Sequence, residues 1–600
     1  MNTTSTLDAK PVKQRHNGYL RGAVIVIAAL VVSVGISFIV PSHGYYLNIM
    51  MQAITYAIAV AGVVVVLGYC GQLALCQAAF LGIGAYCVAV GTVDYGMPFF
   101  AALALGVAVA ALGGIVLGLA SLRLGGHYLA MVTIGFQEIV TLVLTNWTGL
   151  THGPDGVSGI GRPMPFGLNL TGGAAYFSLC IFILALVMFA VAELKASRLG
   201  RAMQAVRDNE LAASTCGING FLTKIIAFGI SAALGGLGGG MFAGAFSYIS
   251  PDQFTFNESI VILTMALLGG IESPYGALLG TVLLVILPEW LRFLRQVYLA
   301  VYGAAVIAIM IFLPRGLWGL LKDRLFTRPA PEHGEVRPLP MLAQQGAASS
   351  ETVLKVRSLA KHFGGLKALD GVDFDVQRGS VHALIGPNGS GKTTFLNVVS
   401  GLYKATAGTV TLRGRDVTAQ PPYTRNRMGL ARTYQNIRVF RGLTVLENVT
   451  IGAERPGANT GAASAMNEDS HERALAALDF VGLRESAELP VGTLSYGHQR
   501  YVEIARALAG CPDILLLDEP AAGLNLTEKG EMAALLRRMK GHGLTIVIID
   551  HDMKLIEQVA DHITVLNFGR RIATGTPTEV LSHPDVIAAY LGKPHYDEAA

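Results

Sequence analysis

Residues 386–393 read Gly-Pro-Asn-Gly-Ser-Gly-Lys-Thr, a complete match to the pattern Gly-x-x-x-x-Gly-Lys-Ser/Thr. An apolar, strand-like run at 381–385 precedes this stretch, and a helix-like run at 394–398 follows it. Between a strand and a helix, the glycines of such a loop let backbone N–H groups close around phosphates, and the helix N-terminus adds positive potential. The stretch therefore predicts an α/β P-loop domain that binds a nucleoside triphosphate.

The residues of this loop have separate predicted roles. Lys392 is expected to reach the β- and γ-phosphates of ATP, and the hydroxyl of Thr393 is expected to bind Mg²⁺. The residues predicted to bind ATP here are Gly386, Pro387, Asn388, Gly389, Ser390, Gly391, Lys392, Thr393 and Thr394.

A second signal for a phosphate site lies downstream. Residues 514–519 read Ile-Leu-Leu-Leu-Asp-Glu, the pattern of a buried strand that ends in two carboxylates. Asp518 suits the coordination shell of Mg²⁺, and Glu519 is placed to polarise the water that attacks ATP. Alone this pattern is weak evidence, but after a P-loop it indicates the hydrolytic side of the same site.

A third motif lies between the P-loop and the Asp-Glu strand, and it identifies the family that this half resembles. Residues 494–500 read Leu-Ser-Tyr-Gly-His-Gln-Arg and open a helical run. With the P-loop and the Asp-Glu strand, this stretch resembles an ABC-transporter ATPase, whose signature is usually Leu-Ser-Gly-Gly-Gln. Tyr496 replaces the first glycine of the pair and His498 stands at the glutamine position, a variant that resembles the ATPases of branched-chain amino acid importers. The resemblance implies that Ser495, Gly497 and His498 contact the ATP held by a second ATPase.

The same resemblance assigns roles to residues elsewhere in this half. Gln435 matches the Q-loop, His551 matches the switch histidine, and Phe363 matches the aromatic residue that stacks on adenine. Asn525 stands where an aspartate is common in the D-loop. The resemblance implies that the catalytic residues are Glu519, His551 and Gln435, and that the Mg²⁺ ligands are Thr393, Gln435 and Asp518.

The composition places the first half of the chain in a membrane. Of 600 residues, 52% are apolar and 14% are charged, whereas soluble domains average about 25% charged. These values exclude an ordinary soluble enzyme and a disordered chain, and a net charge of +4 implies no nucleic-acid partner. Between residues 22 and 192 the charged side chains are Asp94, Arg123, Glu138, Asp155 and Arg162.

The apolar runs predict about ten membrane spans. A bilayer core needs about 20 apolar residues per helix. The predicted spans lie at 20–40, 46–67, 73–92, 97–122, 128–146, 174–194, 223–247 and 297–314, with a broken apolar stretch at 259–290. Residues 269–274, Gly-Gly-Ile-Glu-Ser-Pro, indicate that this stretch is two short segments. The predicted fold is a polytopic α-helical membrane domain with broken helices, followed by an α/β P-loop NTPase domain of the ABC type.

Basic residues orient the membrane domain. The N-terminal tail and segment 195–222 carry Lys and Arg, which predicts that both are cytoplasmic and that the loop at 147–173 is outside. A stretch at 322–350 with several prolines and alanines is typical of a flexible linker. We predict a cytoplasmic tail at 1–20, a transmembrane permease domain at 20–321, a linker at 322–350 and an ATP-binding domain at 351–597.

The membrane half resembles the permease of branched-chain amino acid importers over most of residues 20–320. The resemblance is carried by residues 68–75, 78–86, 153–160, 197–207 and 248–251. Residues 76–77 read Cys-Gln where Gly-His is often found in the family. An exporter-type half-transporter is the first alternative, but such proteins resemble six long helices rather than ten short, glycine-broken spans.

Segment 195–222 is the predicted coupling element between the two halves. Within it, residues 208–217 are expected to form a short helix that docks near Gln435. The candidate coupling residues are Arg207, Asp208 and Glu210. The alternative is that the arginines of this segment only anchor the loop at the membrane surface.

The resemblance also implies an assembly. In this family two ATPase domains enclose ATP, so one chain needs a second ATP-binding subunit and a second permease subunit. A periplasmic solute-binding protein would deliver the solute to a multi-pass importer surrounded by lipid in the bacterial inner membrane. Homodimerisation remains the competing arrangement, and a membrane-anchored ATPase without transport is the alternative from another class.

The sequence does not decide which solute the protein transports. Branched-chain or related hydrophobic amino acids fit the resemblance, and urea, short amides or aromatic acids are alternatives that related importers handle. Arg123 and Glu138 are intramembrane charges that either line the path or sit at helix ends near water. Asp94, Asp155 and Arg162 are expected in loops.

Overall fold

The computed structural model describes residues 44–120, 127–163, 172–291, 298–313, 316–319, 351–454 and 463–591. The predicted tail at 1–20, the predicted span at 20–40 and the predicted linker at 322–350 lie outside these residues. The chain divides into two compact units, one formed by Met1–Met203 with Phe221–Arg328, and the other by Gln204–Gly220 with Pro329–Ala600. Each unit is described by itself.

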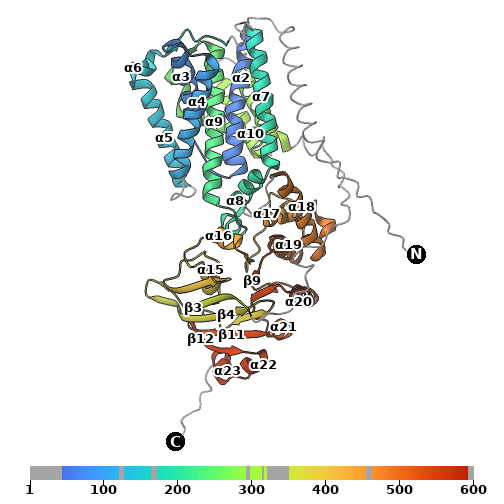
Figure 1. Cartoon of the computed structure of the whole chain (residues 1–600). Helices are drawn as coiled ribbons and strands as arrows, with labels where there is room; N and C mark the ends of the chain where they lie inside the picture. The colour runs from blue at the N-terminus through green and yellow to red at the C-terminus, as the bar shows by residue number, and fades with distance from the viewer. Residues whose placement is uncertain are drawn as a thin grey trace, which may run out of the picture. The chain divides into compact units, whose positions relative to one another are not determined.

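The first unit is a bundle of apolar helices that run side by side (Figure 1). Its helices are α2 (Tyr45–Val63), α3 (Gln77–Val93), α4 (Phe99–Ala120), α5 (His127–Asn146), α6 (Thr148–Thr151), α7 (Gly173–Ala196), α9 (Gly220–Phe246), α10 (Phe256–Gly269), α11 (Pro274–Leu291) and α12 (Tyr298–Phe312). Among the described residues, six helices are long and apolar enough to cross a membrane, and α3 and α10 are shorter apolar helices. Each predicted span inside the described ranges corresponds to a helix.

The predicted break in the stretch at 259–290 is present. Helix α10 ends at Gly269 and α11 begins at Pro274. Gly270 has φ +112°, a conformation that residues with a side chain rarely adopt, and proline at the first helical position fits the start of α11. The break therefore follows directly from the Gly-Gly and Ser-Pro pairs.

Helix α3 begins within the bundle rather than at its end. A π-helix at Val64–Tyr69 continues α2, and residues 70–76 are non-helical before α3 begins at Gln77. The first N–H groups of α3 are bound by side chains, Ala78 N–H by Ser259 Oγ at 2.9 Å and Ala79 N–H by Gln137 Oε1 at 2.7 Å. Because lipid offers no hydrogen bonds, a helix end at membrane depth is stable only with such partners.

Glycines explain how closely α9 packs against α3. A Cβ atom at Gly239 would lie 1.8 Å from the carbonyl oxygen of Leu81, and one at Gly84 would lie 2.0 Å from that of Gly236. No residue larger than glycine fits at these two positions without moving a helix. The glycine-rich run at 235–240 therefore allows this close approach of the two helices.

The second unit contains two β-sheets with helices around them. The six-stranded sheet has the order β12 (Arg570–Gly575), β11 (His562–Asn567), β5 (Val381–Ile385), β10 (Thr545–Ile549), β9 (Ile514–Asp518) and β8 (Leu430–Arg432). All its neighbours pair in parallel except β12 with β11. Strands β5, β9 and β10 are buried along their whole length, as their continuous apolar sequences predict.

The second sheet is antiparallel, in the order β4 (Leu366–Gln377), β3 (Thr352–Phe363), β6 (Ala407–Leu412) and β7 (Arg415–Asp416). The helices of this unit are α15 (Lys392–Val399), α16 (Pro422–Arg427), α17 (Val445–Ala453), α18 (Ala463–Phe480), α19 (Tyr496–Ala509), α20 (Leu526–Gly541), α21 (Met553–Val559), α22 (Pro577–Leu581) and α23 (Pro584–Leu591). Helix α8 (Arg198–Thr215) brings residues 204–215 into this unit.

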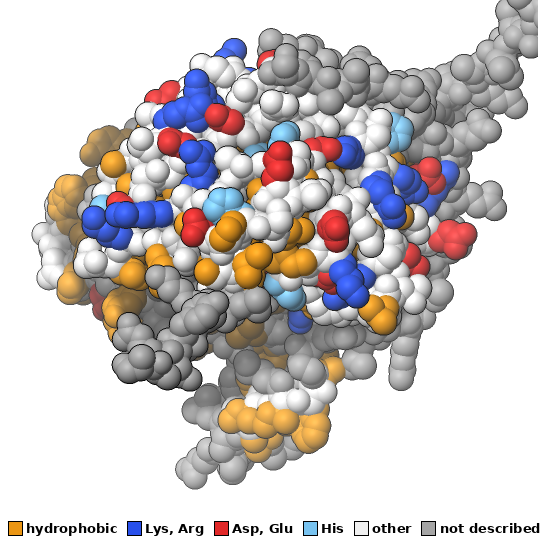
Figure 2. All heavy atoms as spheres, turned by 90° about the horizontal axis from the view of Figure 1, so that it is seen from below, with side chains coloured by type: hydrophobic (Ala, Val, Ile, Leu, Met, Phe, Trp, Pro, Cys, Tyr) orange, Lys and Arg blue, Asp and Glu red, His pale blue; other side chains and the backbone are white. Residues whose placement is uncertain are grey.

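Charges on the surface of the second unit are mixed in sign. On the face that carries α22 and α23, Figure 2 shows basic and acidic side chains interspersed. Exposed ion pairs of this unit include Arg570 with Asp370 at 2.6 Å and Arg357 with Asp375 at 2.7 Å. The charge pattern on this face therefore suits water rather than one strongly charged partner.

Candidate functional site

The P-loop lies between β5 and α15, as the sequence predicts. Gly386, Gly389 and Gly391 have φ values of +150°, +80° and +102°, which glycine adopts without strain. Lys392 Nζ donates hydrogen bonds to the carbonyl oxygens of Gly386 and Pro387 at 2.7 and 2.9 Å. The Lys392 ammonium is thus held across the mouth of the loop.

Two features of the loop suit a bound phosphate. The Ser390 hydroxyl oxygen is buried and has no hydrogen-bond partner among the described residues, which is costly unless a ligand supplies one. Burial lowers the pKa of the Lys392 ammonium from its ordinary value, and the carboxylates of Glu519 and Asp518 oppose this shift. An anionic ligand beside Lys392 would act in the same direction as these carboxylates and favour the charged ammonium.

The two carboxylates after β9 occupy different environments. Asp518 is buried and forms an ion pair of 3.0 Å with the buried guanidinium of Arg432. Arg432 also donates to Asn397 Oδ1 at 2.7 Å and to Ser400 Oγ at 2.8 Å, so Asp518 is tied to α15 and the residue that follows it. Glu519 has φ +48°, a strained value for a non-glycine residue that tends to occur at functional positions.

The three residues predicted to be catalytic lie together. Gln435 Nε2 donates to Glu519 Oε2 at 2.9 Å, and His551 Nδ1 lies 3.7 Å from the same oxygen. The His551 side chain is 71% exposed. A carboxylate flanked by an amide and an accessible imidazole can orient a water molecule and accept its proton.

The signature residues lie at the beginning of α19. Ser495 is the N-cap of this helix, and its Oγ accepts a hydrogen bond of 3.3 Å from His498 N–H. A Cβ atom at Gly497 would lie 2.9 Å from Glu528 Oε1, so this position has no room for a side chain unless Glu528 moves. Asn525 caps α20 by accepting from Glu528 N–H at 2.9 Å, which gives it a structural role within its own chain.

Sequence reasoning did not single out the residues that join α19 to the Q-loop. Arg500 is fully buried, and its guanidinium donates to the carbonyl oxygens of Tyr434 and Gln435, the latter at 2.6 Å. The buried carboxylate of Glu503 pairs with Arg500 at 3.2 Å. Arg506 donates to Arg438 O at 2.9 Å. The helical spacing 500, 503 and 506 of charged residues was the available signal, because three charges on one face of a buried helix require partners.

Phe363 lies at the end of β3, before the P-loop in the sequence. Its residue is 43% exposed, and its ring is edge-on to Tyr403 with centroids 5.5 Å apart. Lys361 Nζ lies 4.9 Å from the ring centroid of Phe363. Tyr403 is therefore a second accessible aromatic ring beside the predicted adenine contact, and the sequence did not indicate it.

The predicted short coupling helix at 208–217 is present as the second part of α8. The label α8 covers Arg198–Thr215, but a non-helical residue at Asn209 (φ −160°, ψ 100°) divides it into two helices, and the second begins next to the predicted start. Asn209 Oδ1 accepts from Ala212 N–H at 2.9 Å, so this residue caps the second part of α8. An asparagine favours this geometry because its side chain replaces the missing backbone acceptor.

Residues 208–217 contact the segment that carries Gln435. Gly442 N–H donates to Asp208 Oδ2 at 2.8 Å, and Arg438 donates to Asn209 Oδ1 at 3.2 Å. Thr215 Oγ1 lies 3.1 Å from the Tyr434 hydroxyl, which also bonds to Leu211 O at 3.2 Å. The last turn of α8 is thus hydrogen-bonded to the residue that precedes Gln435.

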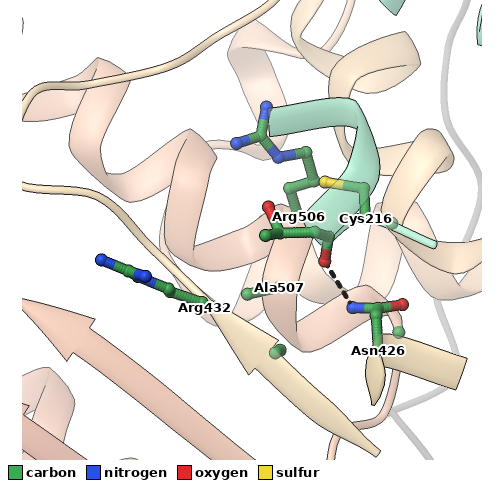
Figure 3. A pocket seen from close by; sticks show the side chains of 9 residues that line it. Cys216, Asn426, Arg432, Arg506 and Ala507 are labelled. Atoms are coloured by element: carbon green, nitrogen blue, oxygen red, sulfur yellow. Dashed lines mark hydrogen bonds between the residues drawn. The ribbon is translucent and has the colours of Figure 1, made fainter. Parts of the chain in front are cut away.

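A small hollow lies beneath this turn (Figure 3). It is lined by Thr215, Cys216, Asn426, Ala431, Arg432, Gly452, Arg506, Ala507 and Gly510. Asn426 Nδ2 donates to Thr215 O at 2.7 Å, and burial raises the pKa of the Cys216 thiol. Cys216 is therefore a neutral packing group rather than a reactive thiolate.

Arg207 and Glu210 complete the predicted coupling set. Arg207 pairs with Asp208 at 3.3 Å. A Cβ atom at Gly220 would lie 3.0 Å from Glu210 Oε1, which places this carboxylate at the beginning of α9. Arg207 and Asp208 therefore lie at the contact with Gly442, and Glu210 lies beside Gly220.

Three of the five charged residues noted in the membrane half of the sequence lie between the long helices. Asp94 pairs with His152 at 2.9 Å, Asp155 lies in a short 3₁₀ turn, and Arg162 donates to Ala245 O at 3.0 Å. These three lie in loops, as expected. Arg123 is outside the described residues, and Glu138 lies on the exposed side of α5. Of the two alternatives for these residues, a place on the path or at a helix end near water, the helix end is wrong for Glu138, which lies well inside α5. A place on the path stays a prediction for both.

Comparison with known proteins places both halves of the chain. Residues 45–313 match the family described as the branched-chain amino acid transport system permease component. Residues 369–522 match the ABC transporter family, and residues 570–596 match the family described as branched-chain amino acid ATP-binding cassette transporter. The ATP-binding protein LivG of Salmonella typhimurium is 42% identical over 254 residues, which cover 99% of LivG and 41% of this chain. The chain belongs to the branched-chain amino acid ABC transporter family.

Two other relatives each match one part of this chain. The ATP-binding protein BraF of Pseudomonas aeruginosa is 41% identical over 254 residues, covering 99% of BraF and 41% of this chain. The permease protein LivM of Salmonella typhimurium is 34% identical over 352 residues, covering 80% of LivM and 55% of this chain. This ABC transporter chain therefore joins a permease part and an ATP-hydrolysing part that its relatives carry on separate proteins, and it is a membrane protein.

Proposed function

We propose that this ABC transporter chain imports branched-chain amino acids across the bacterial inner membrane at the expense of ATP. The relatives LivG, BraF and LivM are all named for high-affinity transport of branched-chain amino acids. The observation that carries the coupling is the continuous set of contacts from Thr215 through Tyr434 and Gln435 to Glu519. A movement of α8 against this segment changes the position of the Gln435 amide on the Glu519 carboxylate.

The hydrolytic step follows from the arrangement around Glu519. Glu519 accepts a proton from the attacking water, and the Gln435 amide and the His551 imidazole orient that water beside it. Lys392 and the N–H groups of the P-loop hold the phosphates, and Phe363 packs on the adenine ring. Ser495, Gly497 and His498 at the beginning of α19 complete the site of a second ATPase.

The residues near the P-loop fit a Mg²⁺ ion bound together with ATP. Mg²⁺ prefers oxygen ligands and retains several waters or phosphate oxygens. The described residues contain no cluster of three or more His, Cys, Asp and Glu that could hold a metal ion. Phosphate oxygens of ATP would provide part of the shell. Thr393, Gln435 and Asp518 would hold the ion, which would neutralise charge on the transferring phosphoryl group.

The assembly proposed here contains more than this chain. One P-loop and one signature helix cannot enclose ATP without a partner, so a second ATP-binding subunit and a second permease subunit complete the transporter. A periplasmic solute-binding protein delivers the solute to the loop at 147–173. We also propose the division into a tail at 1–20, a permease domain at 20–321, a linker at 322–350 and an ATP-binding domain at 351–597.

Uptake in cells tests this function. Cells that lack their own branched-chain amino acid uptake receive the chain with its co-expressed partners, and uptake of labelled leucine is compared for wild type and Glu519→Gln. We expect uptake by the wild type only, with excess isoleucine and valine competing and urea, acetamide and benzoate not competing. Leucine uptake that persists in Glu519→Gln would contradict ATP-driven import, and competition by urea or benzoate alone would assign another cargo.

A further inference from the structure

One long helix of the first unit exposes most of its surface. In the most apolar part of α5, 22% of the residues are buried, compared with 83% in α2, and α5 is the least buried of the six long apolar helices described. Its exposed residues recur at helical spacing and form one stripe, which we call the α5 face. The α5 face consists of Tyr128, Met131, Gly135, Glu138, Ile139, Leu142, Val143 and Asn146.

Glu138 lies near the middle of this face. Helix α5 has 20 residues and is about 30 Å long, so Glu138 lies roughly 12–17 Å from its two ends. No residue in the described part of the chain forms a hydrogen bond or ion pair with Glu138. A carboxylate that faces hydrocarbon at this depth is strongly disfavoured, and such residues instead face protein or a water-filled cavity.

The neighbouring Gln137 prevents α5 from rotating to bury Glu138 within the unit. The Gln137 side chain accepts from Ala79 N–H at 2.7 Å and donates to Phe254 O at 2.8 Å. These bonds satisfy the beginning of α3, and any rotation of α5 would break them. The outward direction of Glu138 is therefore a fixed property of the bundle.

Helix α4 provides a comparison within the same unit. Its large exposed side chains are Phe100, Leu105, Val109, Leu112, Ile115, Val116 and Leu119. Every one of them is apolar, and α4 contains no polar residue at all, which suits contact with lipid. The α5 face differs because it combines apolar residues with Glu138, Gly135 and Asn146.

Gly135 gives a second, independent indication of a protein partner. A Cβ atom at Gly135 would meet nothing within 4 Å, so packing within the unit does not require glycine here. Glycine on the surface of a membrane helix allows the backbone of another helix to approach closely. Gly135 lies about one turn from Glu138. The site where another helix can approach closely and the carboxylate of Glu138 therefore lie together on the α5 face.

We infer that the α5 face is the surface on which the second permease subunit packs, and that this subunit presents a cationic side chain to Glu138. The inference rests on the proposed function, which requires a second permease. The apolar run at 22–40 of this chain is another candidate to cover this face, but its polar side chains are only Ser33 and Ser37. These serines can donate a hydrogen bond, but the run has no basic residue that could neutralise the charge of Glu138.

Photo-crosslinking tests which protein covers the α5 face. The full-length tagged chain carries p-benzoylphenylalanine in place of Met131 or Leu142 on α5, or of Val109 or Leu112 on α4 as matched apolar controls. After illumination in native membranes, adducts are identified by mass spectrometry. We expect the α5 positions to yield an adduct with a permease-type subunit, either a separate protein or a second copy of this chain, and the α4 positions to yield none.

Three results would overturn the inference: lipid as the sole adduct from α5, an adduct between α5 and residues 22–40 of the same chain, or equal permease adducts from α4. If the wild type transports leucine but crosslinks its permease partner elsewhere, only this inference fails. If no permease partner is found and no leucine is taken up, the proposed function fails with it.

Gly135→Leu provides a test that does not depend on crosslinking. Because nothing lies near Gly135 within the unit, this variant should keep the melting temperature of the isolated chain while at least tenfold less permease partner co-purifies. Glu138→Leu should lose the partner in the same way, whereas Glu138→Gln should retain part of it. Normal recovery of the partner with Gly135→Leu and Glu138→Leu would contradict the inference.

Discussion

The hydroxyl of Thr215, in the last turn of α8, lies 3.1 Å from the hydroxyl of Tyr434. Tyr434 immediately precedes Gln435, whose amide donates to Glu519 at 2.9 Å. Arg500 holds the carbonyl oxygens of both Tyr434 and Gln435 from the signature helix. One short segment therefore connects α8, the candidate catalytic carboxylate and the helix that would contact a second ATPase.

Tyr434→Phe should uncouple hydrolysis from uptake. This change removes the hydroxyl that contacts Thr215 and Leu211 O but keeps the aromatic ring beside Arg432 and Arg438. With each hydrogen bond contributing about 1 kcal/mol, we expect the amount of leucine imported per ATP to fall about tenfold, with ATPase activity within about twofold of wild type. Tyr423→Phe, in which the ring still contacts Arg427, is the control and should transport normally.

Asp208→Asn should weaken the same contact from its other end. The Asp208 carboxylate accepts from Gly442 N–H at 2.8 Å and pairs with Arg207. A hydrogen bond to a charged acceptor contributes about 2 kcal/mol, so uptake should fall severalfold while the chain remains folded. The double variant Arg207→Ala with Glu210→Ala should uncouple further, and unchanged leucine uptake in both variants would remove these residues from the coupling.

Glu519→Gln should abolish hydrolysis and keep nucleotide binding. The substitution preserves the size of the side chain and removes the base that accepts the proton of water. We expect ATP turnover to fall about 10²–10³-fold, measured by phosphate release, with ATP affinity within about threefold of wild type. Glu557→Gln, at an exposed position of α21, is the control; a loss of turnover in this variant, or turnover by Glu519→Gln near wild type, would contradict the assignment.

Stability should decrease on acidification because of His382. Burial, together with the nearby His562, lowers the pKa of His382 from 6.5 to about 4 in the folded protein. The unfolded chain therefore binds a proton that the folded chain rejects between pH 6.5 and 4. Stability from this histidine is fully present above pH 6.5 and is lost as the pH falls toward 4, by about 3 kcal/mol in total.

Calorimetry of the full-length protein checks this effect. Between pH 7 and 5 the melting temperature should fall less in His382→Gln than in wild type, because glutamine does not titrate and can still bond to Thr564. His583→Gln changes an exposed histidine and should leave the pH dependence as in wild type. An equal pH dependence in all three proteins would exclude His382 as the cause.

The features that were predicted from the sequence are those that depend on residues close together in the chain. The P-loop, the Asp-Glu pair after β9 and the break between α10 and α11 each need only local residues, whose conformational preferences survive in the fold. The apolar runs predict the helices of the bundle for the same reason, since burial in lipid depends on composition along one helix.

The features that the sequence did not predict depend on partners far along the chain. Gln137 caps α3 across 58 residues, and Arg500 binds the Gln435 carbonyl across 65. Neither side chain has a neighbour in sequence that reveals its partner. The short helix predicted at 208–217 is present, but the sequence did not predict the helical residues from Arg198 that precede it and meet it at Asn209.

The account depends most on the coupling of ATP hydrolysis to solute movement through α8 and Tyr434. The direct measurement is the simultaneous recording of ATP hydrolysed and leucine taken up by proteoliposomes that contain the complete transporter with its solute-binding protein. The account predicts a constant ratio of leucine to ATP for wild type, and a ratio about tenfold lower for Tyr434→Phe at nearly unchanged hydrolysis. ATP hydrolysis with no leucine uptake by the wild type, or an unaltered ratio in Tyr434→Phe, would contradict it.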